Sequence, residues 1–250
     1  EFGQLSRDFD VMADKLQESI SKLESDMQRQ ESFMGAFAHE LKTPMTSIIG
    51  FADLLRQGNM DESTRIMASE YIFSEGKRLE RLSFKLLELL LLKKDTLTMT
   101  RVWLNTYLGE VERALAPNMK AKNIRLVCKA EAKRVILETD LVKSLLYNLV
   151  DNASKAMDNG GIIAVHGIAI PGGCQFQVVD NGRGMEPAEL TKITEAFYRV
   201  DKARSRSQGG AGLGLALCKQ IVELHNGSIQ FASTPGKGTR VTVTLYGKAG

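Results

Sequence analysis

The sequence predicts a protein of two parts: a long α-helical hairpin that pairs with a second copy into a dimeric four-helix bundle, followed by an α+β sandwich. A coiled-coil-like apolar stripe runs through residues 5–90, a short turn at residues 58–61 interrupts it, and residues 97–246 change to a pattern of strands and helices. The chain has 250 residues, of which 43% are hydrophobic and 25% charged. This composition excludes wholesale disorder and allows a sizeable core.

The first helix is expected to run from residue 5 to about residue 57. Its apolar positions are separated mostly by alternating steps of four and three residues, which indicates a coiled-coil seam. Two successive steps of four at Met12, Leu16 and Ile20 form a stutter, and we expect it to pass an upstream rotation along the helix. A helix cannot bury such a stripe against itself, so a partner is expected. The stripe consists of Leu5, Phe9, Met12, Leu16, Ile20, Leu23, Met27, Met34, Phe37 and Leu41.

A short turn at residues 58–61 separates the first helix from a second one. Asp61 or Ser63 is a suitable N-cap for this second helix. A turn this short favours an antiparallel hairpin, and two hairpins would enclose both stripes in a four-helix bundle. The alternative is a bundle with the C-terminal part of the same chain, but that part has a pattern of its own. The second stripe consists of Ile66, Met67, Tyr71, Ile72, Leu79, Leu82, Leu86, Leu89 and Leu90.

The C-terminal part predicts an α+β sandwich with helices packed on one side of a sheet. Segments rich in Pro and Gly at residues 171–173 and 235–238 join neighbouring strands as hairpins. Between residues 181 and 210 the chain becomes rich in Gly, Arg and Ser, which is typical of a mobile loop. The expected strands lie near 97–102, 124–129, 134–138, 162–170, 174–180, 228–233 and 239–246, and the expected helices at 105–119, 140–158 and 211–225.

Charge, cysteine and hydropathy patterns exclude several classes of protein. The 33 Lys and Arg residues exceed the 30 Asp and Glu residues by three, which is too little to indicate nucleic-acid binding. Cys128, Cys174 and Cys218 are too widely spaced for a disulfide framework or a zinc site and suit a reducing cytosol. No segment approaches the roughly 20 apolar residues of a membrane span. The opening lacks Met and a signal peptide, so we expect a soluble piece of a longer protein.

Three polar or glycine-rich clusters lie in the C-terminal part. In Asp180–Gly184, which follows an apolar strand, the carboxylate can accept from an exocyclic amine while the glycines let backbone approach a flat ring. Residues 209–215 open a helix whose N-terminus favours phosphate, although they match neither the dinucleotide nor the Walker spacing. Asn148, Asn152 and Lys155 share a helix face that suits hydrated Mg²⁺ and phosphates. Each cluster alone is more often a plain turn or a solvated stripe, but three in one domain favour a functional interpretation.

His39 is the candidate nucleophile in the helical part. Phe37 and Leu41 belong to the seam, so His39, two residues from each, is expected on the outer face. A lone surface histidine usually has no function, but Glu40 beside it can orient the ring or accept its proton. Pro44 has no N–H for the carbonyl of Glu40, so the helix is expected to weaken or bend one turn beyond His39. A neutral imidazole in this position is available as a nucleophile.

Five blocks in this order resemble the sensor histidine kinases of two-component systems. Together they are specific and cover about residues 30–246. The opening residues, 1–16, are similar to the second helix of a HAMP relay. The blocks are Ala38–Pro44 for the H-box, Asn148–Lys155 for the N-box, Asp180–Gly184 for the G1 box, Glu195–Asp201 for the F-box and Gly210–Leu215 for the G2 box.

The resemblance implies a dimerisation and phosphoacceptor hairpin followed by an ATP-binding domain of the GHKL (Bergerat) type. It implies that His39 attacks the γ-phosphorus of ATP, with Glu40 as base or orienter of the ring and Arg199 reaching the γ-phosphate. It makes Asn152 the Mg²⁺ ligand and Asp180 the acceptor of the adenine amino group. The other nucleotide-binding residues that it implies are Asn148, Lys155, Gly182, Gly184, Phe197, Gly210, Gly212, Leu213 and Gly214.

The resemblance also implies partners and a location. The phosphoryl group would pass to an aspartate of a response regulator, a separate protein. Residues 39–43 match the H-E-x-x-T pattern associated with dephosphorylating that partner, so Thr43 is predicted to position a water molecule in a bifunctional kinase and phosphatase. The chain would be the cytoplasmic portion of a bacterial sensor anchored in the cell membrane. Its expected domains are a HAMP-like signalling helix at 1–29, the phosphotransfer hairpin at 30–95 and the catalytic domain at 96–250.

Two other classes of protein fit the sequence less well. A chaperone or mismatch-repair type ATPase would hydrolyse ATP, but it has no place for His39 and Glu40 on a hairpin. A non-catalytic dimeric scaffold would bind nucleotide only to set its conformation, but His39, Asn152 and Asp180 are all present. The chain departs from the family pattern at Ala156, where many relatives carry an aromatic residue. The other two histidines, His166 and His225, are assigned no role.

Overall fold

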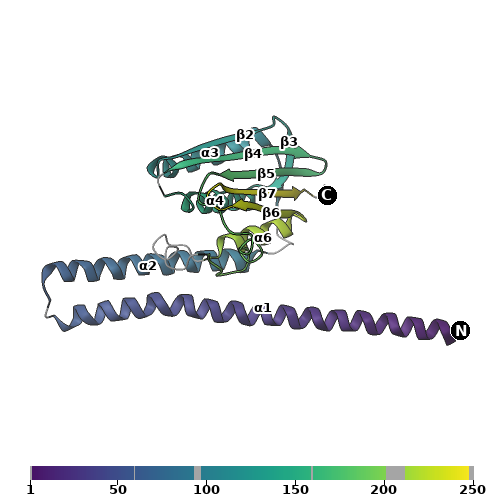
Figure 1. Ribbon diagram of the computed structural model, residues 1–250, viewed down its shortest axis with the longest axis horizontal. Coiled ribbons are helices and arrows are strands. Elements are labelled where there is room, and N and C mark those ends of the chain that lie inside the picture. The colour runs from purple at the N-terminus through teal and green to yellow at the C-terminus, as the bar shows by residue number, and fades with distance from the viewer. Residues whose placement is uncertain (1, 59, 93–96, 159, 201–211, 248–250) are drawn as a thin grey trace. The chain divides into compact units, whose positions relative to one another are not determined.

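The computed structural model describes residues 2–58, 60–92, 97–158, 160–200 and 212–247, except the side chains of residues 2–11, 13, 26 and 29. Contacts divide the chain into two compact units, Glu1–Leu79 and Glu80–Gly250. Helices dominate the first unit, and a sheet with helices forms most of the second (Figure 1). The predicted combination of a helical hairpin and an α+β domain is therefore confirmed.

The first unit is an antiparallel hairpin of α1 (Phe2–Gln57) and the first part of α2 (Glu62–Leu91), joined by a short turn (Figure 1). The rings of Phe51 and Tyr71 stack with their centroids 4.7 Å apart, and Ala68 is buried. No helix in the described part of the chain is long and apolar enough to cross a membrane. Leu5 and Phe9 of the predicted stripe lie outside the described side chains. The exposed members of the stripe are Met12, Leu16, Ile20, Leu23, Met27 and Met34.

Helix α1 continues through Pro44, which lies inside it. Hydroxyl groups on either side donate to backbone carbonyls four residues earlier: Thr43 to His39 at 3.3 Å, and Thr46 to Lys42 at 2.8 Å. Such bonds add side-chain donors to a stretch in which proline removes one backbone donor. Neither bond reaches the Glu40 carbonyl, which is the acceptor that loses its backbone donor at Pro44, but α1 is continuous through the proline.

Helix α2 begins directly after Asp61. The backbone N–H of Arg65 donates to the Asp61 carbonyl at 3.1 Å, and the Ser63 hydroxyl donates to the Asp61 carboxylate. Hydrogen bonds from the hydroxyls of Ser63 and Thr64 lower the pKa of Asp61. Both predicted capping residues therefore take part in the start of the helix.

The second unit contains a five-stranded sheet in the order β2-β4-β5-β7-β6, and a separate antiparallel pair of β1 with β3. Strands β2 and β4 are parallel, and the other neighbours in the large sheet are antiparallel. The predicted hairpins lie between β4 and β5 and between β6 and β7. The strands are β1 (Met99–Trp103), β2 (Ile124–Ala130), β3 (Arg134–Glu138), β4 (Gly161–Ile170), β5 (Gly173–Asp180), β6 (Ser228–Thr234) and β7 (Gly238–Tyr246).

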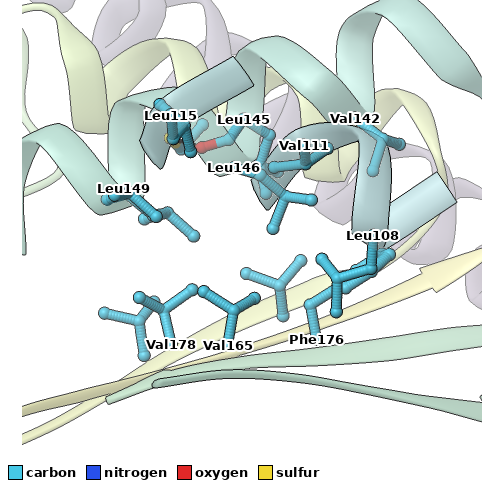
Figure 2. Packing of buried hydrophobic residues seen from close by; sticks show 14 of the residues in the cluster. Leu108, Val111, Leu115, Val142, Leu145, Leu146, Leu149, Val165, Phe176 and Val178 are labelled. Carbon is cyan, nitrogen blue, oxygen red and sulfur yellow. Dashed lines mark hydrogen bonds between the residues drawn. The ribbon is translucent and has the colours of Figure 1, made fainter. Parts of the chain in front are cut away.

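Helices α3 (Leu104–Ala121), α4 (Thr139–Lys155) and α6 (Gly214–Leu224) pack on the sheet. Figure 2 shows apolar side chains of α3 and α4 facing those of β4 and β5. The α+β sandwich is therefore built as two layers around one core. Residues in this interface include Leu108, Val111, Leu115, Val142, Leu145, Leu146, Leu149, Val165, Phe176 and Val178.

Two helix boundaries in the second unit differ from the prediction by three residues. Helix α6 begins at Gly214 and not at residue 211, because Gly212 has a φ of +71°, outside the range of a right-handed helix. Helix α4 ends at Lys155 and not at residue 158. Its C-cap, Ala156, has a ψ of −4° and donates its N–H to the carbonyls of Asn152 and Ala153. Local turn geometry at single residues sets both boundaries.

Candidate functional site

A pocket of about 210 Å³ opens in the second unit beside α4, the end of β5 and the residues that precede α6. It collects residues from the N-box, G1, F-box and G2 blocks, which are far apart in sequence. Four predicted site residues do not line the pocket, although each is a sequence neighbour of a residue that does: Asn148, Gly182, Phe197 and Leu213. Gly210 lies outside the described residues. The predicted site residues that line it are Asn152, Lys155, Asp180, Gly184, Arg199, Gly212 and Gly214.

Asp180 is the last residue of β5 and is only 8% exposed. Its Oδ1 accepts the backbone N–H groups of Gly182 at 2.8 Å and Thr239 at 3.2 Å. Burial raises the pKa of Asp180, while these two hydrogen bonds oppose the rise. One carboxylate oxygen is thus fixed by the protein. The other oxygen has no hydrogen bond within the described residues and is available to a ligand in the pocket.

The glycines that follow Asp180 are required by the packing of the protein itself. A Cβ atom at Gly182 would lie 2.8 Å from the carbonyl oxygen of Ala156. Gly184 has a φ of +68°, and a Cβ there would lie 2.0 Å from the carbonyl oxygen of Thr234. Both positions therefore exclude a larger residue, independently of any ligand.

Helix α4 presents the three predicted N-box residues in different states. The Nδ2 atom of Asn152 is buried without a hydrogen-bond partner among the described residues. The Asn148 amide has hydrogen-bond partners within the protein: its Nδ2 donates to the Ser144 carbonyl at 2.9 Å, and its Oδ1 accepts from Lys85 at 3.0 Å. Lys155 pairs with Asp151 at 2.6 Å. Because a buried N–H donor without a partner is costly, Asn152 is the N-box residue that most clearly fits an absent ligand with an acceptor oxygen, such as a phosphate. Mg²⁺ would instead be bound by the amide oxygen of Asn152.

The F-box and G2 blocks are joined by their backbones. The N–H of Phe197 donates to the carbonyl of Gly212 at 2.9 Å, and both residues have positive φ values, +65° and +71°. A Cβ at Gly212 would lie 2.7 Å from the carbonyl carbon of Phe197. Leu213 is buried in the protein, and a Cβ at Gly214 would lie 3.0 Å from Oδ1 of Asn148. These glycines let two loops and α4 pack closely at the rim of the pocket.

The first unit carries the other predicted catalytic residues. The His39 side chain is exposed on α1. The Glu40 carboxylate accepts from Arg78 of α2 at 3.2 Å, and both side chains are mostly buried, 14% and 13% exposed. The Thr43 hydroxyl donates to the backbone carbonyl of His39. The exposure of His39 agrees with the expected outward position, and Glu40 is held by an ion pair that joins the two helices.

Several residues of the pocket have no local signal in the sequence. Thr239 anchors Asp180 through a backbone N–H, a group that every residue except proline carries. The Tyr198 hydroxyl donates to Glu189 at 2.5 Å, and this hydrogen bond raises the pKa of Tyr198. Lys85 reaches the pocket from the end of α2 and donates to Asn148 at 3.0 Å. Burial is the main cause that lowers the pKa of Lys85, and the charge of Lys155 adds to it.

Two family models match the chain in the regions just described. The His Kinase A (phospho-acceptor) domain matches residues 29–93, which include His39. The family of histidine kinase-, DNA gyrase B- and HSP90-like ATPases matches residues 138–248, which include Asn152 and Asp180. The chain is thus a protein with a phospho-acceptor region followed by an ATPase domain.

Relatives of known name agree with this class. The sensor histidine kinase YclK of Bacillus subtilis is 30% identical over 250 residues, which cover 98% of this chain and 52% of YclK. The sensor protein SrrB of Staphylococcus aureus is 32% identical over 230 residues, which cover 87% of this chain and 38% of SrrB. The chain belongs to the sensor histidine kinases of two-component systems, and it spans about half or less of the length of these two relatives.

Solved structures agree in fold. The Acinetobacter baumannii histidine kinase AdeS superposes with a TM-score of 0.65 at 19% identity, covering 83% of this chain and 97% of that chain. The histidine kinase ThkA, solved in complex with the response regulator protein TrrA, gives a TM-score of 0.68 at 23% identity, covering 90% of this chain and 66% of that chain. At these identities the likeness concerns the fold.

Proposed function

We propose that this chain is the kinase portion of a two-component sensor, which transfers the γ-phosphoryl group of ATP to His39 and then to an aspartate of a response regulator. The observation that carries the proposal is one pocket that combines a half-anchored carboxylate, Asp180, with an unpartnered buried amide, Asn152. Membership of the family supports the same reaction. An exposed imidazole in the phospho-acceptor region supplies the acceptor.

In this proposal the pocket binds ATP from its base to its phosphates. The free oxygen of Asp180 accepts the adenine amino group, and the fixed oxygen keeps the carboxylate in place. Lys155, Arg199 and Asn148 bind or position the phosphates, and Asn152 holds Mg²⁺ through its amide oxygen. When bound, Mg²⁺ would neutralise charge that develops on the phosphates. The frame of the pocket would be made by Gly182, Gly184, Phe197, Gly210, Gly212, Leu213 and Gly214.

The proposed transfer replaces one bond to phosphorus with another. A nitrogen of the His39 ring bonds to the γ-phosphorus, the bond from that phosphorus to the bridging oxygen breaks, and ADP leaves with the electron pair. The ring loses its N–H proton to an acceptor, a role proposed for Glu40. The ion pair with Arg78 fixes the Glu40 carboxylate beside the acceptor residue, so a positioning role for Glu40 is also consistent with the geometry.

Further parts of the proposal concern partners and neighbouring domains. We assign homodimerisation to the exposed stripe of the hairpin and recognition of the response regulator to the region around His39. Thr43 would act in a phosphatase reaction by leaving the carbonyl of His39 and positioning a water molecule. We also propose domains at 1–29, 30–95 and 96–250, with a HAMP-like first helix and a parent protein anchored in a membrane.

Incubation with γ-labelled ATP and Mg²⁺ tests the proposed reaction. The unchanged chain should acquire a label that is stable in alkali and lost in acid, as expected for a phosphoramidate. His39→Gln should acquire none. The matched control is His166→Gln, which removes an exposed imidazole from the second unit and should label normally. Label on His39→Gln, or release of free phosphate by all three proteins without labelling, would refute the proposal.

A further inference from the structure

Lys85 is a cation in the pocket that none of the family blocks contains. It lies in the last part of α2, which belongs to the second unit, because that unit begins at Glu80. Its Nζ donates to Oδ1 of Asn148 at 3.0 Å. The side chain lines both the pocket that contains Asp180 and an adjoining hollow along α4. Lys85 thus stands where the N-box face meets the pocket.

Two carboxylates, Asp151 and Glu88, lie near enough to favour the charged form of Lys85, but neither forms an ion pair with it. No carboxylate of the described residues lies within 4.0 Å of its Nζ. Glu88, one turn further along α2, accepts instead from the hydroxyl of Ser144. Asp151 pairs with Lys155 at 2.6 Å. An ammonium group has three N–H donors, and the neutral amide of Asn148 occupies one of them. Within the part of the chain that the structure describes, the other two donors have no partner, and a half-buried ammonium in this state is costly unless an anion meets it.

The position of Lys85 is built by the packing around it. Leu82 is buried, and Leu89 and Leu92 pack against the hydrophobic core of the second unit. The hydrogen bond between Glu88 and Ser144 adds a polar contact from α2 to α4. Residues 82–92 therefore hold the side chain at the pocket from both sides along the helix. The packing of these leucines and the hydrogen bond between Glu88 and Ser144 indicate that the fold itself keeps the Lys85 side chain half-buried at the pocket.

We propose that Lys85 is a phosphate-binding residue of the nucleotide site, supplied by α2 and not by the ATPase blocks. The inference rests on the proposed binding of ATP to this pocket. Lys85 lines this pocket together with three further cations, Lys155, Arg183 and Arg199. A polyphosphate is the ligand class that such a group of cationic side chains binds. The Lys85 ammonium would donate to a phosphate oxygen through its remaining N–H groups, while its hydrogen bond to Asn148 keeps the ammonium in place.

An opposite role makes the opposite prediction. Lys85 would instead be a plug if its ammonium occupied the phosphate region only while nucleotide is absent. If Lys85 binds phosphate, its removal should weaken the binding of ATP and ADP. If Lys85 is a plug, its removal should strengthen that binding. Adenosine lacks phosphates, so its affinity should not change when a phosphate-binding residue is removed. The sign of the change for ATP and the comparison with adenosine therefore decide between the roles.

Calorimetric titration of the full chain with ATP, ADP and adenosine tests the inference. Lys85→Met should bind ATP and ADP about tenfold to a hundredfold more weakly, because a hydrogen bond from a charged donor is lost. It should bind adenosine as the unchanged chain does, and Lys85→Arg should recover most of the loss. Arg81→Met removes an exposed cation from the same helix and should alter ATP binding less than about twofold.

Three results would overturn the inference. Lys85→Met could bind ATP as tightly as the unchanged chain or more tightly, which would make Lys85 a spectator or a plug. It could lose adenosine binding in parallel, which would make Lys85 a structural support. Arg81→Met could lose as much as Lys85→Met, which would make the effect one of general charge. Failure of the proposed function is separate, since the unchanged chain would then bind no ATP at all.

Discussion

The two units of this chain treat their apolar side chains in opposite ways. In the second unit, Leu145 and Phe176 are completely buried between helices and sheet (Figure 2). In the first unit, Leu16 and Leu23 of the α1 stripe are 62% and 69% exposed. One unit therefore completes its core within a single chain. The other leaves its seam exposed, which is why we propose that a second copy of the hairpin covers it.

The main candidate functional groups are buried in the second unit and exposed in the first. The second unit buries Asp180 and the amide of Asn152 in a pocket, where fixed hydrogen-bonding groups can select a small ligand. The first unit leaves His39 on its surface, where a nucleotide and a partner protein can both reach it. The comparison teaches that binding requires a built pocket, whereas a phosphoryl acceptor requires access. Changes in either unit should therefore have separable effects.

The largest effect is expected from breaking the seam. Leu16→Gln with Leu23→Gln removes four leucines from a dimer, each contributing about 1.5 kcal/mol, so the dimer should weaken by about four powers of ten. Analytical ultracentrifugation should show monomers. The control, Lys15→Gln with Lys22→Gln, changes the preceding residues and should stay dimeric. A doubly substituted leucine variant that remains dimeric would contradict the role of the stripe.

The next largest effect concerns folding of the second unit. Gly184→Ala should destabilise this unit by about 3 kcal/mol, because a positive φ and a contact with the Thr234 carbonyl both oppose a Cβ atom. Trp103, the single tryptophan, lies in β1 and reports on this unit alone. Urea unfolding followed by its fluorescence measures the change. An unaltered transition would show that the loop accommodates alanine.

Asp180→Asn should separate binding from stability. The asparagine oxygen can still accept from Gly182 and Thr239, but its NH₂ group would then face the adenine amino group, donor to donor. ATP should bind about tenfold to a hundredfold more weakly in calorimetry. Asp140→Asn, the same change at an exposed position of α4, should bind normally. Unchanged affinity in Asp180→Asn would remove Asp180 from adenine recognition.

The same variant carries a pH prediction whose sign follows from the raised pKa of Asp180. A carboxyl group whose pKa is higher in the folded than in the unfolded state destabilises the fold when ionised, and this penalty disappears as the pH falls through the folded-state pKa. Asp180→Asn should therefore be at least as stable as the unchanged chain at pH 7. Its advantage should shrink toward acidic pH in urea titrations. A clearly less stable variant at pH 7 would show that the ionised carboxylate supports the fold.

The smallest effect is expected inside a helix. Gly109 lies in α3, and a Cβ there would meet no atom within 4 Å. Gly109→Ala should stabilise the second unit by about 1 kcal/mol, because alanine has the higher helix propensity. The fluorescence of Trp103 in urea measures this as well. Together with Gly184→Ala it shows that two glycines of one unit respond with opposite signs.

Sequence alone predicted the elements well because long periodic patterns specify them. It predicted Asp180 as a site residue because a carboxylate between a strand and glycines is a local signal. It could not predict Lys85, which lies among leucines of a helix outside every family block, or the pair of Glu40 with Arg78, which are 38 residues apart. The start of α6 was misplaced because one positive φ at Gly212 decides it. Contacts between residues that are far apart in the sequence cannot be predicted from a short segment of it.

The central claim is that the second unit binds the nucleotide whose phosphoryl group the hairpin accepts on His39. The most direct test is to locate that group by mass spectrometry at neutral to alkaline pH, after incubation of the unchanged chain with ATP and Mg²⁺. The account predicts a single modified residue, His39, and predicts that Asp180→Asn needs about tenfold to a hundredfold more ATP to be modified to the same extent. A phosphoryl group on His166, His225 or a hydroxyl residue, or equal modification of Asp180→Asn, would contradict it.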